Sequence, residues 1–299
     1  MDLNEYQRLA NLTDQRPAPA AGDEDEDDHG ALVYPLVGMA SEVGSLLTQY
    51  KRRVRDRDAH ELFSERVGEE LGDILWYLAN LATKMNLSLE QVATRNLDRV
   101  NERWPTEGAT VPEKLLDDGF PKSEQLPRRA SVRFAAVEID GKMKVQIRSE
   151  GDQLGNDLTD MNYADDGYRF HDAFHLTYAA LLGWSPVSRS FFKTKRASDP
   201  RVREIEDGGR AVVIEEAISA YVFEYAQHAA FLDGVTTLDY ELLRTIKGMC
   251  SHLEVRARTS AEWQAAILRS FDIWRALRDN AGGIVHLDLS ARTIDFEAG

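Results

Sequence analysis

The chain has 299 residues, enough for two domains, and its 43% hydrophobic and 29% charged residues are typical of a globular protein. A formal net charge of −15 argues against a duplex nucleic-acid binder, which needs a broad basic surface. The single cysteine, Cys250, excludes an intramolecular disulfide, and we expect a buried thiol in a cytoplasmic protein. No apolar run approaches the roughly 20 residues that cross a bilayer, and no secretory signal is recognisable, so no membrane role is expected.

Helical periodicity dominates the first third of the chain. Apolar residues at helical spacing predict a short helix over residues 3–13, which an acidic loop rich in proline and alanine follows. Ser88, with Gln91 three residues later, is typical of a helix N-terminus, and Pro105 stops the pattern. Three longer helices are predicted, at about residues 31–55, 60–85 and 88–103.

The rest of the chain mixes both periods. Residues 106–128, rich in proline, glycine and charge, indicate a linker, and Asp140-Gly141 between two alternating runs predicts a β-hairpin over 132–148. Helices and a strand-like tail are expected at about 166–182, 208–231, 237–255, 260–279 and 284–289. The predicted fold class is mainly α, with a helical bundle, a linker with a β-hairpin, and a second mostly helical domain, in residues 1–108, 109–150 and 151–299.

Three carboxylates stand out on the two long helices. Glu42 has Met39 and Leu46 beside it, where an unpaired charge would be costly. Glu70 and Asp73 are three residues apart and therefore project from one helical face. Two antiparallel helices would bring these carboxylates together, and oxygen ligands alone favour Mg²⁺ or Mn²⁺. Spacing alone leaves open the alternative that these acids pair with lysine or arginine at the edge of the bundle.

The N-terminal third resembles the three-helix core of the MazG-like nucleoside triphosphate pyrophosphohydrolases. The resemblance covers about residues 30–104 and rests on three segments in matching order, GMASEVGSLL, GEELGDILWYLANLA and LSLEQVATRNLDRVNERW. In that family an ExxE motif and an ExxD motif hold the metal. Glu42 matches the first acid, and Glu70 and Asp73 match the second pair, so the resemblance implies that these three are catalytic metal ligands.

One position departs from the family pattern. Ser45 stands where the family usually has its second glutamate, which removes one charge from the implied site. Glu69 or water could fill in, or the domain could have lost activity. The implied reaction is the hydrolysis of a nucleoside triphosphate between the α and β phosphates with Mg²⁺ or Mn²⁺, giving a monophosphate and pyrophosphate.

Further residues match substrate-facing positions of the family. The resemblance implies that Lys51, Asn96 and Arg99 face the phosphates, and the last two share a helical face. Trp76, three residues after Asp73, could stack on a base, although a tryptophan in this apolar run is more often part of a core. Family members usually dimerise or tetramerise to complete the site, so a homodimer or higher oligomer is expected.

The second half carries its own polar cluster. His171 and His175 are one helical turn apart, Asp172 follows the first, and Glu215 and Glu216 lie on a later helix. Two histidines and a carboxylate could bind a metal, and a hydrogen-bonded structural network is the alternative. The basic stretch over 189–203 favours a solvated loop.

The C-terminal half also allows two comparisons. IEEAISAYVFEYAQHA can be laid over GEELGDILWYLANLAT, which suggests a degenerate copy of the first domain in which Ser219 replaces Asp73. A different helix topology would argue against that copy. The region also resembles the C-terminal extension of some MazG-like proteins, on the run RFHDAFHLTYAALLGWSPV, and this resemblance implies fold without chemistry.

Three functions follow from these features. The first is an active nucleotide pyrophosphohydrolase. The second is a nucleotide-sensing or interaction protein that Ser45 has impaired and that acts through its C-terminal domain. The third is a phosphohydrolase centred on His171, Asp172, His175 and Glu215 or Glu216. The sequence leaves open the base and sugar preference, a modified or signalling nucleotide as substrate, and the cellular pathway.

Overall fold

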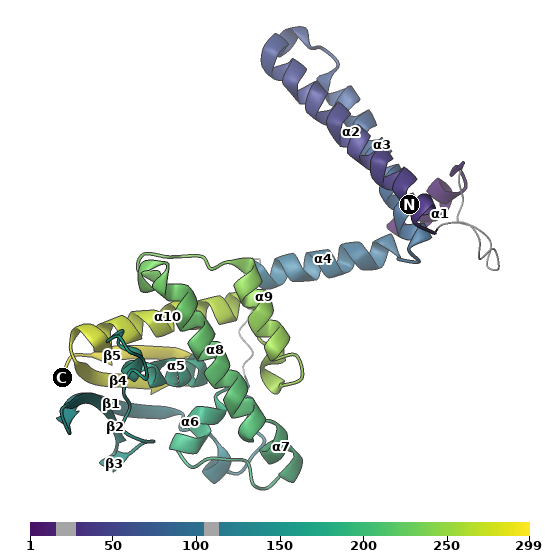
Figure 1. Cartoon of the computed structure of the whole chain (residues 1–299). Helices are drawn as coiled ribbons and strands as arrows, with labels where there is room; N and C mark the ends of the chain where they lie inside the picture. Colours follow the sequence, from purple (N-terminus) through teal and green to yellow (C-terminus); the bar gives the residue numbers. More distant parts are fainter. Residues whose placement is uncertain (16–27, 105–113) are drawn as a thin grey trace. The chain divides into compact units, whose positions relative to one another are not determined.

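The computed structural model describes residues 1–15, 28–104 and 114–299, and it divides into two compact units, Met1–Asn101 and Glu102–Gly299 (Figure 1). Most of the acidic loop after the first helix, and the first part of the predicted linker, lie outside the described residues. The mainly helical class predicted from the sequence is confirmed, with a small antiparallel sheet in the second unit.

The N-terminal unit is built from helices whose bounds agree with the predicted ones to within a few residues. They are α1 (Leu3–Asn11), α2 (Asp28–Asp56), α3 (Phe63–Lys84) and α4 (Leu89–Arg103), the last of which ends two residues beyond the unit. The Ser88 hydroxyl accepts a hydrogen bond from the Gln91 backbone N–H at 3.3 Å, as expected for a cap. A 3₁₀ turn at Arg57–Ala59 joins α2 to α3, so these two long helices form an antiparallel hairpin.

Close packing within this hairpin depends on small residues. The Tyr77 ring occupies the space that a Cβ on Gly38 would fill, with the nearest ring atom 2.2 Å from that position. Further along the same C-terminal half of α3, Ala79 and Ala82 are buried against Ala10 of α1 and Leu89 of α4. This arrangement fixes one face of α3 against α1 and another against α2.

The apolar stripe of α2 lies on its exposed side. Val37, Leu47, Tyr50 and Val54 are 61–65% exposed although they recur at helical spacing. The sequence indicates a buried stripe here, but Gly38, Glu42 and Gln49 face α3 instead. A two-helix hairpin can bury only one stripe of each helix, so this second stripe stays exposed among the described residues of the N-terminal unit.

The same helix bears on the expectation of no membrane role. Ala31–Asp56 is long and apolar enough to cross a bilayer by length and composition alone. The expectation that no apolar run in this chain approaches the length of a membrane span is therefore wrong. The helix also carries Glu42 and Gln49 toward α3, and one-sided apolarity is equally typical of a helix that packs on a protein partner.

The second unit combines a sheet with helices. Its described residues form a five-stranded antiparallel sheet in the order β3-β2-β1-β4-β5. The predicted hairpin is confirmed, because Asp140 and Gly141 have positive φ values of 54° and 71° and join β1 to β2. The strands are β1 (Arg129–Ile139), β2 (Lys142–Ser149), β3 (Asp152–Gln153), β4 (Gly282–Asp288) and β5 (Thr293–Glu297).

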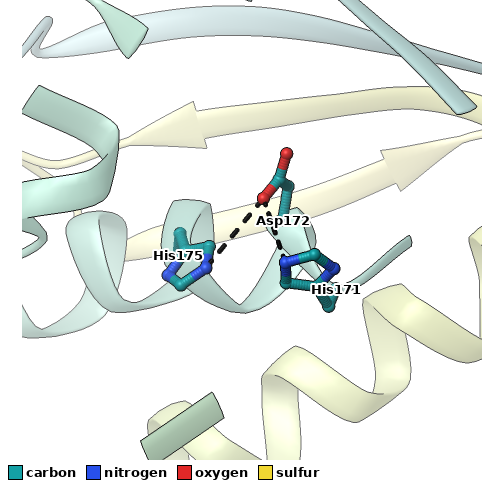
Figure 2. A group of neighbouring side chains, drawn as sticks. All are labelled: His171, Asp172 and His175. Carbon is teal, nitrogen blue, oxygen red and sulfur yellow. Dashed lines mark ion pairs between the residues drawn. The ribbon is translucent and has the colours of Figure 1, made fainter. Parts of the chain in front are cut away.

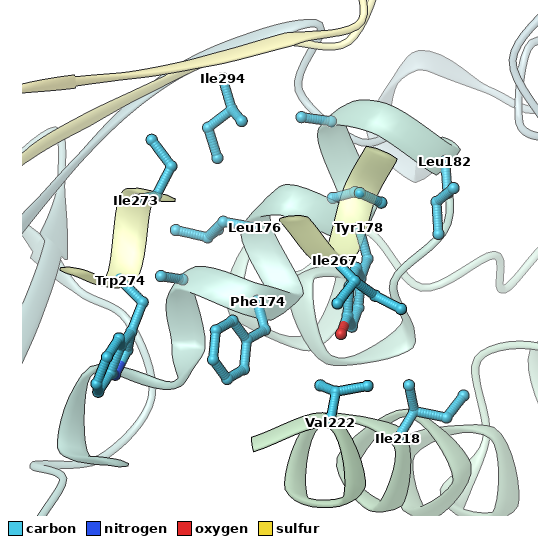
Figure 3. Packing of buried hydrophobic residues seen from close by; sticks show 14 of the residues in the cluster. Phe174, Leu176, Tyr178, Leu182, Ile218, Val222, Ile267, Ile273, Trp274 and Ile294 are labelled. Carbon is cyan, nitrogen blue, oxygen red and sulfur yellow. The ribbon is translucent and has the colours of Figure 1, made fainter. Parts of the chain in front are cut away.

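The helices of the second unit surround α5. Nearly every residue of this helix is buried, and Phe174, Leu176, Tyr178 and Leu182 pack against α8, α10 and β5 (Figure 3). Cys250 is fully buried, as expected, and burial raises the pKa of its thiol to about 12. The helices are α5 (Asp172–Leu182), α6 (Pro186–Phe191), α7 (Pro200–Ile205), α8 (Gly209–Gln227), α9 (Tyr240–Met249) and α10 (Ser260–Asp279).

The stretch interpreted as a solvated basic loop, and the described part of the one interpreted as a linker, are packed in the structure. Arg189 and Arg196, in the stretch expected to be a basic loop, are each 1% exposed. Arg189 donates to Asp117 in the predicted linker at 2.8 Å, and Arg196 donates to Asp207 and Glu254 at 2.7 Å. The linker after residue 114 and the hairpin therefore belong to the body of the second unit. Their place there is fixed by buried ion pairs between residues that are remote in sequence.

The architecture also argues against a degenerate copy of the first domain. In the N-terminal unit the main helix pair is the α2–α3 hairpin, whereas in the second unit α5 packs on α10 and on the sheet. Ser219, the counterpart of Asp73 in the overlay, is buried in the core and bonds to its own helix.

Candidate functional sites

Two antiparallel helices bring the first set of carboxylates together. Glu42 lies on α2, and Glu70 and Asp73 lie one turn apart on α3. A carboxylate oxygen of each residue lies within 4.8 Å of the others, so three negative charges converge in one small volume. Glu42 and Glu70 are half-buried and Asp73 is exposed, which leaves the cluster open to solvent on one side.

The electrostatics of this cluster suit a cation. Partial burial, the charge of Asp73 and the neighbouring Glu70 raise the pKa of Glu42 above its ordinary value. Within the described part of the chain, no lysine or arginine forms an ion pair with these three carboxylates, in contrast to the alternative that the sequence leaves open. Oxygen donors without sulfur or imidazole fit Mg²⁺ or Mn²⁺, so the residues present suit the implied ion.

Gln49 is a member of this site that the sequence analysis missed. Its side chain is buried, its Nε2 donates to Glu70 Oε1 at 3.1 Å, and its Oε1 has no hydrogen-bond partner among the described residues. Gln49 lies seven residues after Glu42, two turns along the same face of α2. That spacing could have identified it, but glutamine lies outside the acidic motif.

The departure at Ser45 is visible in the same face of α2. Ser45 is half-buried, three residues after Glu42 and four before Gln49. Glu69, the candidate replacement for the missing acid, is exposed and is not among the carboxylates that converge. The structure therefore brings together three of the four acids named for the metal.

The residues expected to face the substrate have no described bond to the three carboxylates. Lys51 on α2 and Asn96 and Arg99 on α4 are exposed, and no described hydrogen bond or ion pair joins them to the carboxylates. The Trp76 indole packs with the α1–α3 cluster and donates to Thr13 Oγ1 at 2.7 Å. These contacts agree with the alternative that Trp76 is part of a core. The stacking of Trp76 on a nucleotide base stays a prediction.

A second cluster lies at the start of α5. The Asp172 carboxylate lies between the imidazoles of His171 and His175, as Figure 2 shows. All three residues are at most 4% exposed. One ligand atom from each lies within 4.8 Å of the others, so the structure brings together the histidine pair and the first carboxylate predicted for this region.

The two glutamates of α8 play different parts. Glu216 faces the histidines, with Oε2 3.4 Å from His175 Nε2 and 3.8 Å from His171 Nε2. Glu215 faces the other side of His175 and is fully buried. Its oxygens accept from His175 Nδ1 at 2.9 Å, Ser185 Oγ at 2.6 Å and the Val187 N–H at 2.9 Å. Only one of the adjacent pair therefore faces the cluster.

Burial and charge perturb the pKa values of this cluster in opposite directions. Burial lowers the pKa of His171 and raises that of Asp172. For His175 burial acts in the same direction as for His171, but the charge and hydrogen bond of Glu215 outweigh it and raise the pKa to about 10. Without a cation, the network thus favours a proton on His175.

Comparison with known proteins identifies the family. A helical hairpin with converging carboxylates, followed by an α+β unit, is typical of a helical nucleotide pyrophosphohydrolase with a C-terminal extension. The chain belongs to the MazG family: residues 36–107 match the MazG nucleotide pyrophosphohydrolase domain, and residues 111–299 match the MazG C-terminal domain. The resemblance found in the sequence is thereby confirmed for both parts.

The chain is also similar to a curated phage protein. The chain is similar to the Gene 37 protein of Mycobacterium phage L5, with 33% identity over 105 residues, which is 34% of this chain and 89% of that protein. No solved structure matches the chain. The family match identifies a nucleotide pyrophosphohydrolase domain, which belongs to the hydrolases. It does not by itself specify the bond cleaved, the metal or the catalytic residues.

Proposed function

We propose that the N-terminal unit hydrolyses nucleoside triphosphates between the α and β phosphates, with Mg²⁺ or Mn²⁺, and releases a nucleoside monophosphate and pyrophosphate. The observation that carries the proposal is the convergence of Glu42, Glu70 and Asp73 within 4.8 Å, inside a segment that matches a nucleotide pyrophosphohydrolase domain. Clustered carboxylates without basic partners are costly unless a cation binds them. A substrate rich in phosphate charge requires the same cation.

The roles of the chain's residues follow from their positions. Glu42, Glu70 and Asp73 would hold the ion, and Gln49 would orient the Glu70 carboxylate through its 3.1 Å hydrogen bond. The bound ion would neutralise charge that develops on the phosphate oxygens. A carboxylate of the cluster would accept a proton from the attacking water, since carboxylates are the acceptors closest to the reacting phosphate.

The substrate contacts belong to the same proposal. Lys51, Asn96 and Arg99 would bind the phosphates, and because they are exposed, a second copy of the chain would complete the contact surface. Trp76 would stack on the base if α1 moves away from it. The expected partners are the nucleotide and a second copy, without duplex nucleic acid or membrane, and a cytoplasmic location is expected.

The test measures pyrophosphate release from a panel of ordinary and modified nucleoside triphosphates with Mg²⁺ or Mn²⁺. The metal contributes several kcal/mol, so Glu70→Gln and Asp73→Asn should each reduce kcat by about 100-fold or more. Glu65→Gln on the same helix makes the same charge change at an exposed position outside the cluster, and it should retain wild-type rates. Equal rates in Glu70→Gln and Glu65→Gln would contradict the assignment.

Ser45 supports one alternative function. If the missing glutamate has impaired catalysis, the protein would bind nucleotide in the presence of metal without releasing pyrophosphate or phosphate. Calorimetric binding combined with product analysis separates this sensor from the enzyme.

Phosphate release that survives Asp73→Asn and ends with His171→Gln would instead favour a phosphohydrolase centred on the α5 cluster.

A further inference from the structure

The cluster at the start of α5 has an orphaned atom at its centre. The His175 side chain is completely buried, yet its Nε2 has no hydrogen-bond partner among the described residues. The nearest acceptors are Glu216 Oε2 at 3.4 Å and Asp172 Oδ1 at 3.9 Å. A buried polar atom without a partner costs free energy, so its position inside a ring of potential ligands requires an explanation.

The surroundings fix which atoms of the two imidazoles face that centre. His171 Nδ1 lies 2.9 Å from the Tyr168 carbonyl oxygen, and His175 Nδ1 lies 2.9 Å from Glu215 Oε1. Both oxygens are acceptors, so each Nδ1 carries a proton, and a cation bound at the centre would meet the lone pair of each Nε2 in place of a second proton. A histidine whose second nitrogen donates to a carbonyl or carboxylate is the usual arrangement around a bound metal ion.

The distances around the centre fit a single ion. The Nε2 atom of His171 lies 3.6 Å from Asp172 Oδ1 and 3.8 Å from Glu216 Oε2. For His175 Nε2 the same two distances are 3.9 Å and 3.4 Å. Four ligands at about 2.0–2.2 Å from a tetrahedral ion are separated by about 3.3–3.6 Å. These four nitrogen–oxygen separations are within a few tenths of an ångström of that range. The ligand atoms of His171, Asp172 and His175 all lie within 4.8 Å of one another, and the Glu216 carboxylate, whose side chain is 43% exposed, would complete the set by a small movement.

We propose that His171, Asp172, His175 and Glu216 bind one divalent transition-metal ion of the Zn²⁺ class. Two imidazole nitrogens with two carboxylate oxygens favour such an ion over Mg²⁺, which prefers oxygen ligands. Glu215 is a positioning residue, because its contacts with Ser185 and Val187 hold the carboxylate that orients His175. Glu216 is 43% exposed, so the ion reaches the site from solvent.

The experiment uses the full chain, freed of metal and then titrated with Co²⁺ in the presence of excess Mg²⁺. Four-coordinate Co²⁺ with nitrogen ligands has intense visible bands, whereas six-coordinate Co²⁺ among oxygens absorbs weakly. We expect about one equivalent of intensely absorbing Co²⁺ per chain, displaced by Zn²⁺. Asp73→Asn should retain this signal, which makes the result independent of the proposed pyrophosphohydrolase site.

Variants localise the ion. Glu216→Gln should weaken binding by at least about 10-fold, and Glu215→Gln, which acts through His175, by about 10–100-fold. Glu224→Gln, an exposed residue on the same helix, is the matched control and should bind like wild type. His175→Gln should lose the bands, and circular dichroism checks its fold because the side chain is fully buried. Absent bands in wild type, or wild-type binding by Glu216→Gln, would overturn the proposal in favour of an imidazolium network.

Discussion

At the level of single residues, Gln49 controls the environment of the Glu70 carboxylate. Its amide occupies a buried position between α2 and α3, where a carboxylate would add charge and an aliphatic side chain would leave Glu70 without this donor. The contact links a residue outside the acidic motif to the proposed metal site. Side chains of this kind tune the affinity of a site without touching the ion.

We predict that Gln49→Leu weakens Mg²⁺ activation of pyrophosphate release by about 10–100-fold in the Mg²⁺ concentration required. The physical reason is the loss of the hydrogen bond that holds Glu70 Oε1. Rates measured across a Mg²⁺ titration test this, with Gln91→Leu on α4 as a control for the same substitution outside the cluster. An unchanged Mg²⁺ requirement would mean that Gln49 serves packing alone.

At the level of elements, the segment after residue 114 is attached to α6 by charge. Asp117 Oδ2 accepts from Arg189 at 2.8 Å and from the Leu126 N–H at 2.7 Å, and Arg128 lies 2.8 Å from Oδ1. Both Asp117 and Arg189 are 1% exposed. Burial disfavours the charged carboxylate, but these contacts outweigh it and hold the pKa of Asp117 below its ordinary value of 3.8.

We predict that Asp117→Asn destabilises the protein by about 3 kcal/mol at neutral pH, because it removes the nearer of the two carboxylates beside the buried Arg189 and leaves Asp207, at 3.5 Å, as the other. A folded-state pKa below 3.8 means that the Asp117 contribution is present above that pH and is lost as the pH falls through the folded pKa. The difference between wild type and variant should therefore shrink in that acid range.

Urea unfolding of the wild type and variant between neutral pH and the acid range measures this difference. Asp118→Asn is the neighbouring control; its side chain is 41% exposed, so it should cost at most about 1 kcal/mol. A stability difference that stays constant through the acid range would show that the ionised carboxylate is not what stabilises the segment.

At the level of the whole molecule, the exposed stripe of α2 is the feature that a single chain leaves unexplained. Val37, Leu47, Tyr50 and Val54 together form a continuous apolar face on one helix, and such faces usually mark protein interfaces. The length and hydropathy of α2 also satisfy the composition of a membrane span. The polar residues opposite the stripe favour association with a second copy.

We predict that the wild-type chain is a dimer or higher oligomer and that Leu47→Glu shifts it toward the monomer. A charge placed in the stripe would be buried without a partner in the assembly, which is costly. Thr48→Glu adds the same charge at the neighbouring exposed position outside the stripe and should leave the assembly intact. Light scattering coupled to size-exclusion chromatography measures the mass, and a wild-type monomer that floats with lipid vesicles would favour the membrane alternative.

Local sequence patterns were enough to place the long helices, the β1–β2 hairpin and the first set of acids, but not the short helices α6 and α7 or the strand β5. Helical periodicity placed the long helices to within a few residues, and the Asp140-Gly141 turn located the hairpin, because local backbone preferences decide both. The spacing of Glu70 and Asp73, with the family resemblance, selected residues that the fold brings near Glu42. These inferences depend only on residues that are close together in the sequence or that belong to one short motif.

Tertiary structure decided which side chains face one another. Glu215 and Glu216 are adjacent on α8, but the approach of α5 and α6 directs one toward Ser185 and the other toward His171. Arg189 is buried because Asp117, 72 positions earlier, supplies its counter-charge. The face of α2 that packs on α3 was likewise set by the close contact at Gly38 rather than by apolar spacing. Contacts between residues remote in sequence depend on how whole elements pack, which periodicity along one element does not record.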